Sequence, residues 1–276
     1  MRTLCSFALL LVACDRPQPL VLCHNANCAT PDISRDDTLD ALAESLALTF
    51  DGKPVIDGVE LDTFWYAAGN GCLFAHDLNG DTSTPASAAA QLVADHLATT
   101  PRASWNGERF YVFIELKGFV GESFDDAHTP AQMEMHADCA LDTLNLIALG
   151  ADAGGHALTV GFISIEPRLL QALTDRPRWD GVAADPKLEV LLVGDVFAPF
   201  HPVIPDIADY KVPLDAVEFH PRHLNAQHRE TYRALGIDLV QWSFITTSES
   251  LASIERWEPK YVLTNEAPFL RRWIEN

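Results

Sequence analysis

The chain has 276 residues, with 39 acidic against 19 basic side chains and a formal net charge of −20. This length is enough for one large domain with a substantial core. So negative a chain is a poor partner for a nucleic-acid backbone or an anionic membrane surface, and a phosphate-bearing ligand would need a local cation. We therefore expect a monomer that binds no nucleic acid.

The N-terminus has the features of an export signal. Arg2 precedes an apolar run from Leu4 to Ala13, and a polar stretch follows Cys14. The run is too short to cross a bilayer as a helix, and a charged start before an apolar core is typical of a secretory signal. The letters LVAC resemble a bacterial lipobox, which implies cleavage before Cys14, a lipid on its sulfur and a membrane-anchored lipoprotein of the periplasm or cell envelope. An ordinary signal peptide cut nearby is the alternative. The predicted divisions are a signal over 1–13, a tether over 14–18 and one folded domain over 19–276.

Beyond the signal, apolar β-type runs alternate with segments of helical periodicity. The predicted strands are Pro19–His24, Gly58–Asp62, Phe110–Leu116, Leu158–Ser164, Leu188–Gly194, Ala216–His220, Leu239–Ser243 and Tyr261–Thr264. The predicted helical segments are 36–48, 85–99, 130–150, 166–175, 225–236, 248–257 and 268–275. This alternation favours an α/β fold in which eight parallel strands close into a single (β/α)₈ TIM barrel. An open doubly wound sheet is the alternative, but no glycine-rich phosphate loop follows the first strand.

Carboxylates and a lysine stand at the ends of the second and third predicted strands. Glu60 and Asp62 share one face of their strand, and Glu115 and Lys117 share one face of theirs, because side chains alternate with a period of two. Strand ends form the functional face of a TIM barrel. Three carboxylates there would repel one another unless a cation lies between them, and an all-oxygen site suits Ca²⁺ or Mg²⁺ better than Zn²⁺. The sequence predicts one divalent cation held by Glu60, Asp62 and Glu115, with Lys117 beside a bound phosphate.

Two histidines accompany these acids. His24 ends the first predicted strand, and His76 ends a short extended piece, Leu73–His76, inserted after the second strand. Such a pair can act as acid and base, because imidazole titrates near neutral pH. His220, at the end of the sixth strand, and Trp242, at the end of the seventh, are candidates for the substrate pocket, although Trp242 is equally explained by packing. The other histidines are predicted to lie at the surface: His96, His128, His136, His156, His201, His223 and His228.

Four cysteines besides Cys14 follow the apolar run. An even number of cysteines outside the cytoplasm permits disulfides, and four allow three pairings. Cys28 and Cys72 both lie in loops close to the histidine motifs, so a Cys28–Cys72 bond is the predicted pairing. Four unpaired thiols are the alternative.

The segments CHN (23–25), DDTLDALAESLA (36–47), GVELD (58–62), FAHD (74–77) and FIELKG (113–118) resemble the N-terminal half of the glycerophosphodiester phosphodiesterase family. The stretch from AVEFHP (216–221) to TNEAP (264–268) resembles that family's closing strands and helices. The resemblance covers nearly the whole chain after the signal. It implies a TIM barrel, a divalent cation on Glu60, Asp62 and Glu115, an acid/base pair of His24 and His76, and Lys117 near the phosphate.

The chain departs from that family at two places. Asn25 stands where the family usually has arginine, and a histidine followed by asparagine is similar to the calcium-dependent phosphoinositide phospholipases C, whose asparagine joins the metal ligands. Asn25 is therefore a fourth expected ligand. The turn RDDT (35–38) replaces the family's PENT-like turn. The E-x-K motif at 115–117 and the region around Trp242 are also similar to sphingomyelinase D.

These features predict a metal-dependent phosphodiesterase that cleaves a glycerophosphodiester or a phospholipid headgroup by histidine acid/base chemistry. One alternative is a phospholipase C or sphingomyelinase D-like lipase that forms a cyclic phosphate. A second is a lipoprotein that binds a phosphorylated ligand without catalysis. A third is a sugar-acting enzyme that uses Glu60 and Glu115 as its two catalytic carboxylates. A third acid and a lysine beside them suit a metal ion better than a sugar ring.

Overall fold

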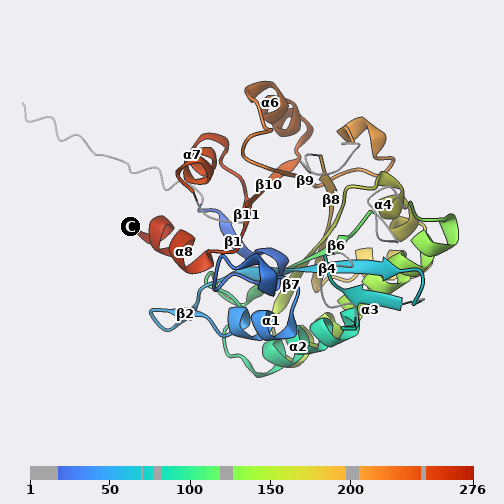
Figure 1. The fold of residues 1–276 in the computed structure, drawn as a ribbon, viewed down its shortest axis with the longest axis horizontal. Helices are drawn as coiled ribbons and strands as arrows, with labels where there is room; N and C mark the ends of the chain where they lie inside the picture. The colour runs from blue at the N-terminus through green and yellow to red at the C-terminus, as the bar shows by residue number, and fades with distance from the viewer. Residues whose placement is uncertain (1–17, 70, 77–82, 119–126, 197–204, 244–246) are drawn as a thin grey trace, which may run out of the picture.

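The computed structural model describes residues 18–69, 71–76, 83–118, 127–196, 205–243 and 247–276, and it forms a closed barrel of parallel strands (Figure 1). The strand order is β1-β11-β10-β9-β8-β7-β6-β4, and a pairing between β1 and β4 closes the ring. Closure excludes the open doubly wound sheet and confirms the predicted TIM barrel. The barrel strands are β1 Leu20–Cys23, β4 Gly58–Tyr66, β6 Arg109–Leu116, β7 Ala157–Ser164, β8 Leu188–Asp195, β9 Ala216–Phe219, β10 Asp238–Ser243 and β11 Tyr261–Thr264.

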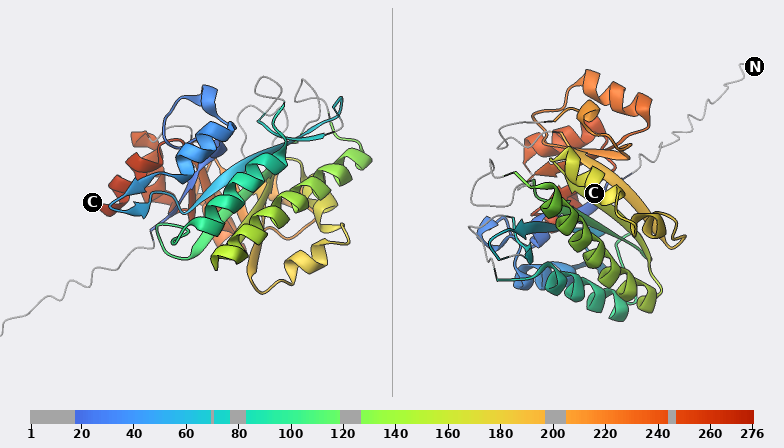
Figure 2. Two further views of the ribbon diagram at one scale, coloured as in Figure 1. Left: turned by 90° about the horizontal axis from the view of Figure 1, so that it is seen from below. Right: turned by 90° about the vertical axis from the view of Figure 1, so that its right-hand side faces the viewer.

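Helices surround the barrel on its outer side (Figures 1 and 2). The long helix α3 begins with a capping box between Thr129 and Gln132 and ends at Gly155, whose φ of 74° suits glycine. Every predicted helical segment contains a helix, and the short α5 was not predicted. None of the described helices is both long enough and apolar enough to span a membrane. The helices are α1 Leu39–Leu46, α2 Ala86–Thr99, α3 Pro130–Gly154, α4 Pro167–Thr174, α5 Trp179–Ala183, α6 Ala226–Leu235, α7 Ser248–Trp257 and α8 Ala267–Glu275.

Two small additions decorate the barrel. Strand β4 continues to Tyr66, and its outer half pairs antiparallel with β5 (Gly71–Phe74), which brings the chain back toward the strand ends. A two-stranded hairpin of β2 (Thr49–Phe50) and β3 (Lys53–Pro54) lies apart from this sheet. The antiparallel return of β5 explains how a residue just after it, His76, reaches the same end of the barrel as Asp62.

The barrel interior has its own apolar core, separate from the larger core between the strands and the helices. Leu22, Phe113, Val193, Val240 and Tyr261 belong to this inner core. Because alternate residues of a strand face the same side, the residues two positions further along each strand lie above this core at the carboxyl end. The inner core is therefore the floor on which polar side chains of the strand ends rest.

The disulfides differ from the predicted pairing. Cys23 bonds Cys28, and Cys72 bonds Cys139, so the predicted Cys28–Cys72 bond is wrong. A 3₁₀ turn over His24–Ala26 reverses the chain after β1 and returns Cys28 to a Cα–Cα distance of 5.0 Å from Cys23. Cys72 on β5 instead faces α3, where Cys139 lies 67 residues further along the chain. The first pairing depends on a local turn and the second on the packing of β5 against α3, and cysteine spacing reveals neither.

Candidate active site

Three carboxylates converge at the carboxyl end of the barrel. Glu60 and Asp62 project from the same face of β4, and Asp62 is in register with Glu115 on the neighbouring β6. One oxygen of each residue lies within 4.8 Å of the other two. Glu60 and Asp62 are fully buried, and Glu115 is nearly so. The acids predicted from strand periodicity are thus brought together in a single cluster.

Lys117 lies among these acids. Its Nζ is 2.9 Å from Asp62 Oδ2 and 2.7 Å from Glu115 Oε2. Burial disfavours its charge, yet Asp62 and Glu115 hold the pKa of Lys117 well above its ordinary value. Burial also raises the pKa of Glu60 and of Glu115. At Asp62 burial acts in the same direction, but Lys117 together with the two histidines outweighs it and lowers the pKa. One ammonium cannot balance three carboxylates, so the cluster has an excess of negative charge.

Several carboxylate oxygens in this cluster have no hydrogen-bond partner. The buried oxygens without a hydrogen-bond partner include Glu60 Oε1, Asp62 Oδ1 and both carboxylate oxygens of Asp37. Asp37 is subject to the charges of Asp62 and Glu60, so its carboxylate lies near the cluster without being one of the three grouped ligands. A buried polar atom without a partner costs about 1–3 kcal/mol. A hard divalent cation with oxygen ligands, such as Ca²⁺ or Mg²⁺, would satisfy the unpaired oxygens of Glu60 and Asp62, so the donor set of Glu60, Asp62 and Glu115 fits the predicted cofactor.

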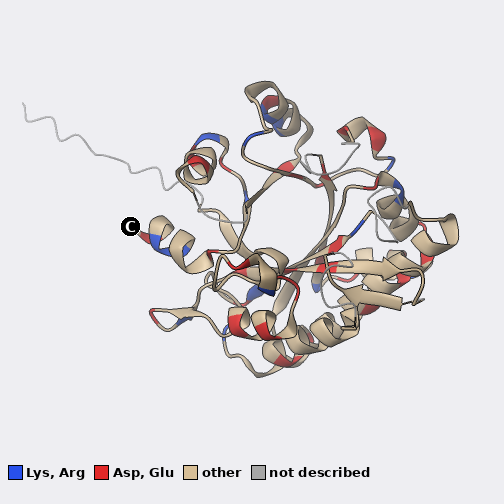
Figure 3. Ribbon diagram, in the orientation of Figure 1, with Lys and Arg blue, Asp and Glu red and all other residues tan. Residues whose placement is uncertain are grey.

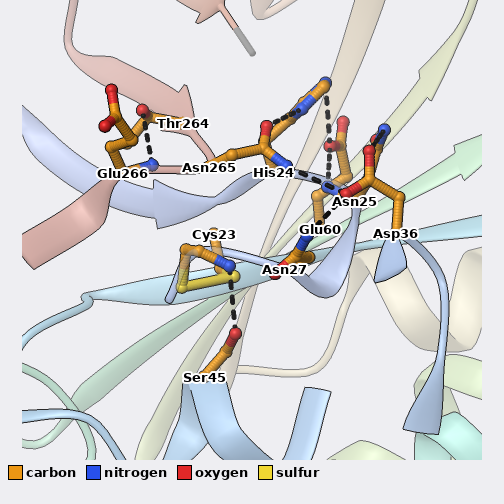
Figure 4. Close-up of a disulfide and its surroundings, with 11 residues drawn as sticks. Cys23, His24, Asn25, Asn27, Asp36, Ser45, Glu60, Thr264, Asn265 and Glu266 are labelled. Atoms are coloured by element: carbon orange, nitrogen blue, oxygen red, sulfur yellow. Dashed lines mark hydrogen bonds and ion pairs between the residues drawn. A yellow bond between two sulfur atoms is a disulfide. The ribbon is translucent and has the colours of Figure 1, made fainter. Parts of the chain in front are cut away.

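His24 is oriented by a chain of hydrogen bonds (Figure 4). Its Nδ1 lies 2.8 Å from Asn265 Oδ1, and Asn265 Nδ2 donates to Asp36 Oδ1 over 3.0 Å. An amide oxygen only accepts, so His24 Nδ1 carries the proton and Nε2 keeps its lone pair. That Nε2 is 3.8 Å from Glu60 Oε2. Burial lowers the pKa of His24 to about 4, so the ring is neutral at pH 7.

Asp36 is the acceptor for three asparagine side chains. Besides Asn265, Asn27 donates to it over 2.8 Å and Asn25 over 3.2 Å. Burial raises the pKa of Asp36 to about 6. The Asn25 amide nitrogen is thus engaged with Asp36, and its backbone N–H donates to Glu60 Oε2 over 3.0 Å. Only the side-chain oxygen of Asn25 is available to a cation, and its role as a ligand stays a prediction.

The turn that carries His24 has an unusual backbone. Asn25 and Ala26 have φ values of 47° and 56°, in the left-handed region that costs about 1 kcal/mol or more for an ordinary residue. The Cys23–Cys28 disulfide closes this turn, and Cys28 N–H donates to Ser45 Oγ on α1 over 3.0 Å (Figure 4). The strained turn is therefore fixed at both ends, which positions the His24 ring over the acids.

His76 and the aromatic side chains complete the rim. His76 follows β5, is partly exposed, and acts electrostatically on His24 and Asp62, so it faces the same space. Trp242 stacks on His24 with ring centroids 5.6 Å apart and planes 8° apart. His220 meets the edge of Trp242 at 5.0 Å and is partly exposed. Trp242 therefore both packs against His24 and forms part of the rim.

Three histidines predicted to be exposed are buried instead: His128, His136 and His156. His136 on α3 contacts Thr63 through Nε2, at 3.0 Å from the hydroxyl and 3.1 Å from the carbonyl, and its Nδ1 is 3.2 Å from His128 Nε2. Burial lowers the pKa of His128 to about 4 and that of His136 to about 3. The surface prediction fails for His128 and His136 because α3 packs this face against β4, next to Asp62. It fails for His156 because this residue packs against the chain after α2, with Nε2 2.9 Å from the Thr100 carbonyl oxygen. His201 lies outside the described residues.

Sequence reasoning missed four polar residues of this region. Asp36 and Asp37 occupy the RDDT turn, whose departure from the family pattern was the available signal. Asp195 ends β8 and Glu218 lies on β9, and both are buried at the carboxyl half of the barrel wall. Their signal was an acid inside or directly after a predicted strand. Acidic segments indeed recur on several strands around the barrel opening (Figure 3). Cys14 and the predicted signal 1–13 lie outside the described residues.

The fold and the site together define a TIM-barrel protein with a buried acidic cluster and a neutral histidine at its carboxyl end. No family model and no curated protein matches the sequence. Solved structures match at low identity. An Oleispira antarctica phosphodiesterase in complex with the product sn-glycerol-3-phosphate has 13% identity, covering 94% of this chain and 98% of that one, with a TM-score of 0.58.

A glycerophosphodiester phosphodiesterase from Parabacteroides distasonis has 13% identity over 94% and 98% of the two chains, with a TM-score of 0.55. A calcium-dependent phosphoinositol-specific phospholipase C from Pseudomonas has 12% identity over 91% and 90%, with a TM-score of 0.50. These likenesses show that the chain has the barrel fold found in glycerophosphodiesterases and phosphoinositide phospholipases. They confirm the resemblance predicted from the sequence at the level of the fold.

Proposed function

We propose that this protein is a metal-dependent phosphoric diester hydrolase that cleaves a glycerophosphodiester or a phospholipid headgroup. The carrying observation is the joint position of unpaired carboxylate oxygens on Glu60 and Asp62 and the Nε2 lone pair of His24. Glu60, Asp62 and Glu115, with Asn25, would hold one Ca²⁺ or Mg²⁺. When bound, such an ion offsets the negative charge that develops on the phosphoryl oxygens.

The protein's own groups supply the proton transfers. His24 Nε2 takes a proton from the attacking oxygen, which its neutral state at pH 7 permits. His76 gives a proton to the leaving oxygen as the bond between phosphorus and that oxygen breaks. Lys117, kept protonated by Asp62 and Glu115, provides a second positive charge near the phosphoryl group. The glycerol 3-phosphate held by the Oleispira antarctica phosphodiesterase supports a substrate with a small phosphodiester.

The nucleophile distinguishes two versions of this function. Attack by water gives the free phosphomonoester directly, whereas attack by a neighbouring hydroxyl of the substrate gives a cyclic phosphate, as in a phospholipase C or sphingomyelinase D-like lipase. Phosphorus NMR of the products separates the two, because a five-membered cyclic phosphate resonates far from a monoester.

The proposal is tested by hydrolysis of glycerophosphocholine and bis(p-nitrophenyl) phosphate, with and without EDTA. His24→Ala and His76→Ala are compared with wild type, and His228→Ala on the outer helix α6 is the matched control. Chelation and both active-site substitutions should each lower kcat about 100-fold or more, while the control keeps full activity. Activity that is unchanged by EDTA, by His24→Ala and by His76→Ala contradicts the mechanism. Phosphodiester binding without any turnover in wild type would favour the alternative of a ligand-binding lipoprotein.

We further propose that the protein is exported and anchored through a lipid on Cys14. The two disulfides support this, because such bonds persist in oxidising compartments. Cys14→Ser should release the protein from the membrane fraction and abolish labelling by radioactive palmitate. Soluble wild-type protein without label would indicate an ordinary signal peptide.

A further inference from the structure

A second acidic pair lies on the barrel wall formed by β8 and β9. Glu218 is in register with Asp195, and both are buried, Glu218 with 4% of its surface exposed. Ala216 and Val193, two residues before each of them, belong to the inner barrel core. Because alternate residues share a face, Glu218 and Asp195 point into the barrel above that core.

The side-chain carboxylate of Glu218 forms no hydrogen bond or ion pair with any other residue in the described part of the chain, although its backbone is paired within the sheet. Charged groups nevertheless act on it across the barrel. Burial raises the pKa of Glu218 well above its ordinary value, and Asp195, Glu60 and Glu115 raise it further. Lys117 lowers it, but less than any of these causes raises it. Glu218 therefore faces the same space as the three clustered carboxylates, from the other side of the barrel, and forms no ion pair with a described residue.

The other charged side chains described at the carboxyl end of the barrel do not neutralise Glu218. Lys117 is the buried lysine of the described chain, and Asp62 and Glu115 already engage it. A divalent cation on the carboxylate cluster would be neutralised there in the same way. A carboxylate that is buried without a partner is unfavourable, and a cationic ligand removes the penalty, which a neutral ligand does not.

An aromatic ring lies next to this pair. Glu218 is in register with Val240 on β10, and Trp242 follows Val240 by two residues on the same inner face. The indole thus lies nearer than Glu218 to the carboxyl end of the barrel. Its ring stacks on His24 beside the carboxylate cluster. Ammonium groups are attracted to tryptophan rings as well as to carboxylates. The carboxylates and the indole together form a wall suited to a positively charged group.

We propose that Glu218, together with Asp195 and Trp242, binds an ammonium group on the alcohol portion of the phosphodiester. The preferred substrates are diesters of choline or ethanolamine, rather than those of glycerol or inositol. This inference rests on the proposed function, since it names the substrate class of the same site. Glu218 acts here as a specificity-determining residue.

The test compares kcat/KM for glycerophosphocholine and glycerophosphoethanolamine with kcat/KM for glycerophosphoglycerol and glycerophosphoinositol. Glu218→Gln should lower the values for the two substrates with an ammonium group about tenfold or more, chiefly through KM, and leave the two substrates with an uncharged alcohol portion within about threefold. Glu255→Gln, at an exposed position of α7, is the matched control and should change none of them. The folded state of Glu218→Gln is checked by its Tm, which should equal or exceed that of wild type because an acid whose ionisation is unfavourable when buried is replaced by a neutral amide of the same shape. Equal losses on all four substrates, or no loss on any, overturn the proposal.

Calorimetric titration with choline chloride alone gives a readout that does not depend on turnover. Wild type should bind choline, and the affinity of Glu218→Gln for choline should be at least about tenfold lower. Choline binding by a wild type that hydrolyses no diester supports the ammonium site and refutes the proposed function. Hydrolysis of all four diesters by a wild type that does not bind choline refutes the ammonium site alone.

Discussion

Asn265 accepts a hydrogen bond from His24, with 2.8 Å between Oδ1 and Nδ1, and so connects the end of β11 to the end of β1. The amide of Asn265 is itself oriented by Asp36, which accepts from its nitrogen. This contact fixes the tautomer of His24 with the proton on Nδ1, so that Nε2 carries the lone pair that the proposed mechanism uses as its base. An asparagine that follows the last barrel strand therefore decides which ring nitrogen carries the proton in a histidine near the start of the chain.

Asn265→Ala removes the acceptor of this bond, so the His24 ring loses its fixed tautomer and orientation. We expect kcat to fall about 10- to 100-fold, the equivalent of one lost buried hydrogen bond, while KM changes little. Asn265→Asp should retain more activity and should move the acidic limb of the kcat/KM profile to higher pH, because an anionic acceptor stabilises protonated His24. Steady-state kinetics from pH 4 to pH 9 provide the check. Asn145→Ala, exposed on α3, is the control, and an unchanged profile in both Asn265 variants would disprove the positioning role.

Divalent cations should stabilise the protein more strongly at pH 8 than at pH 5.5. Burial raises the pKa of Glu60 and Glu115, so in the metal-free protein protons bind these groups more tightly in the folded than in the unfolded state. These two carboxyl groups therefore favour the folded metal-free protein more strongly as pH falls, whereas a cation must displace their protons and binds best at high pH. The test compares Tm in about 5 mM CaCl₂ or MgCl₂ with Tm in EDTA at each of the two pH values. A cation effect that is equal at the two pH values would contradict it.

Asp37→Asn should weaken cation binding about tenfold, because both oxygens of Asp37 are buried without a partner beside the carboxylate cluster. Removal of this charge should also raise the Tm of the metal-free protein, since it relieves repulsion with Asp62. Calorimetric titration with CaCl₂ and a thermal melt in EDTA measure the two effects. Asp40→Asn, in the first turn of α1, serves as control. A Tm that falls in EDTA would mean that Asp37 has a purely structural role.

The buried pair His128 and His136 should make the protein acid-sensitive. Their pKa values of about 4 and about 3 lie below the unfolded value near 6.5. Below about pH 6.5 these histidines therefore bind protons in the unfolded chain but not in the folded chain. The free energy of unfolding falls as pH falls toward about 4. We expect the free energy of unfolding to drop by about 2–4 kcal/mol between pH 7 and pH 5. Urea titrations with saturating CaCl₂ keep the clustered acids occupied during this measurement.

His136→Gln should reduce that pH dependence by about half, since one of the two protonation sites is gone. A dependence as steep as in wild type would assign the acid sensitivity to other groups, among them His24.

The two disulfides should separate activity from stability. The chain-entropy model gives about 2 kcal/mol for the short Cys23–Cys28 loop and about 4 kcal/mol for the 67-residue separation of Cys72 and Cys139. Cys28→Ser should nevertheless cause the larger loss of kcat, because that bond closes the turn carrying His24. Cys139→Ser should cause the larger loss of Tm. The reverse order of kcat values in the two variants would show that the turn holds its shape without the bond.

The sequence by itself determined the barrel and the carboxylate cluster. Eight apolar runs separated by helical segments specify parallel strands with crossovers, and period-two spacing places Glu60 with Asp62 and Glu115 with Lys117 on inward faces. Parallel neighbours present their carboxyl ends at one rim, so local patterns suffice to bring these four residues together.

Only the tertiary structure decided the disulfide partners, the burial of His136 and the meeting of Asp37 and Glu218 with the carboxylate cluster. Each depends on which distant segments pack against one another: β5 against α3 for Cys72 and Cys139, α3 against β4 for His136, and β9 across the barrel from β4 for Glu218. Such contacts arise from closure of the ring, a long-range event that no local periodicity encodes, because the same spacing of residues is compatible with many arrangements of the elements that carry them.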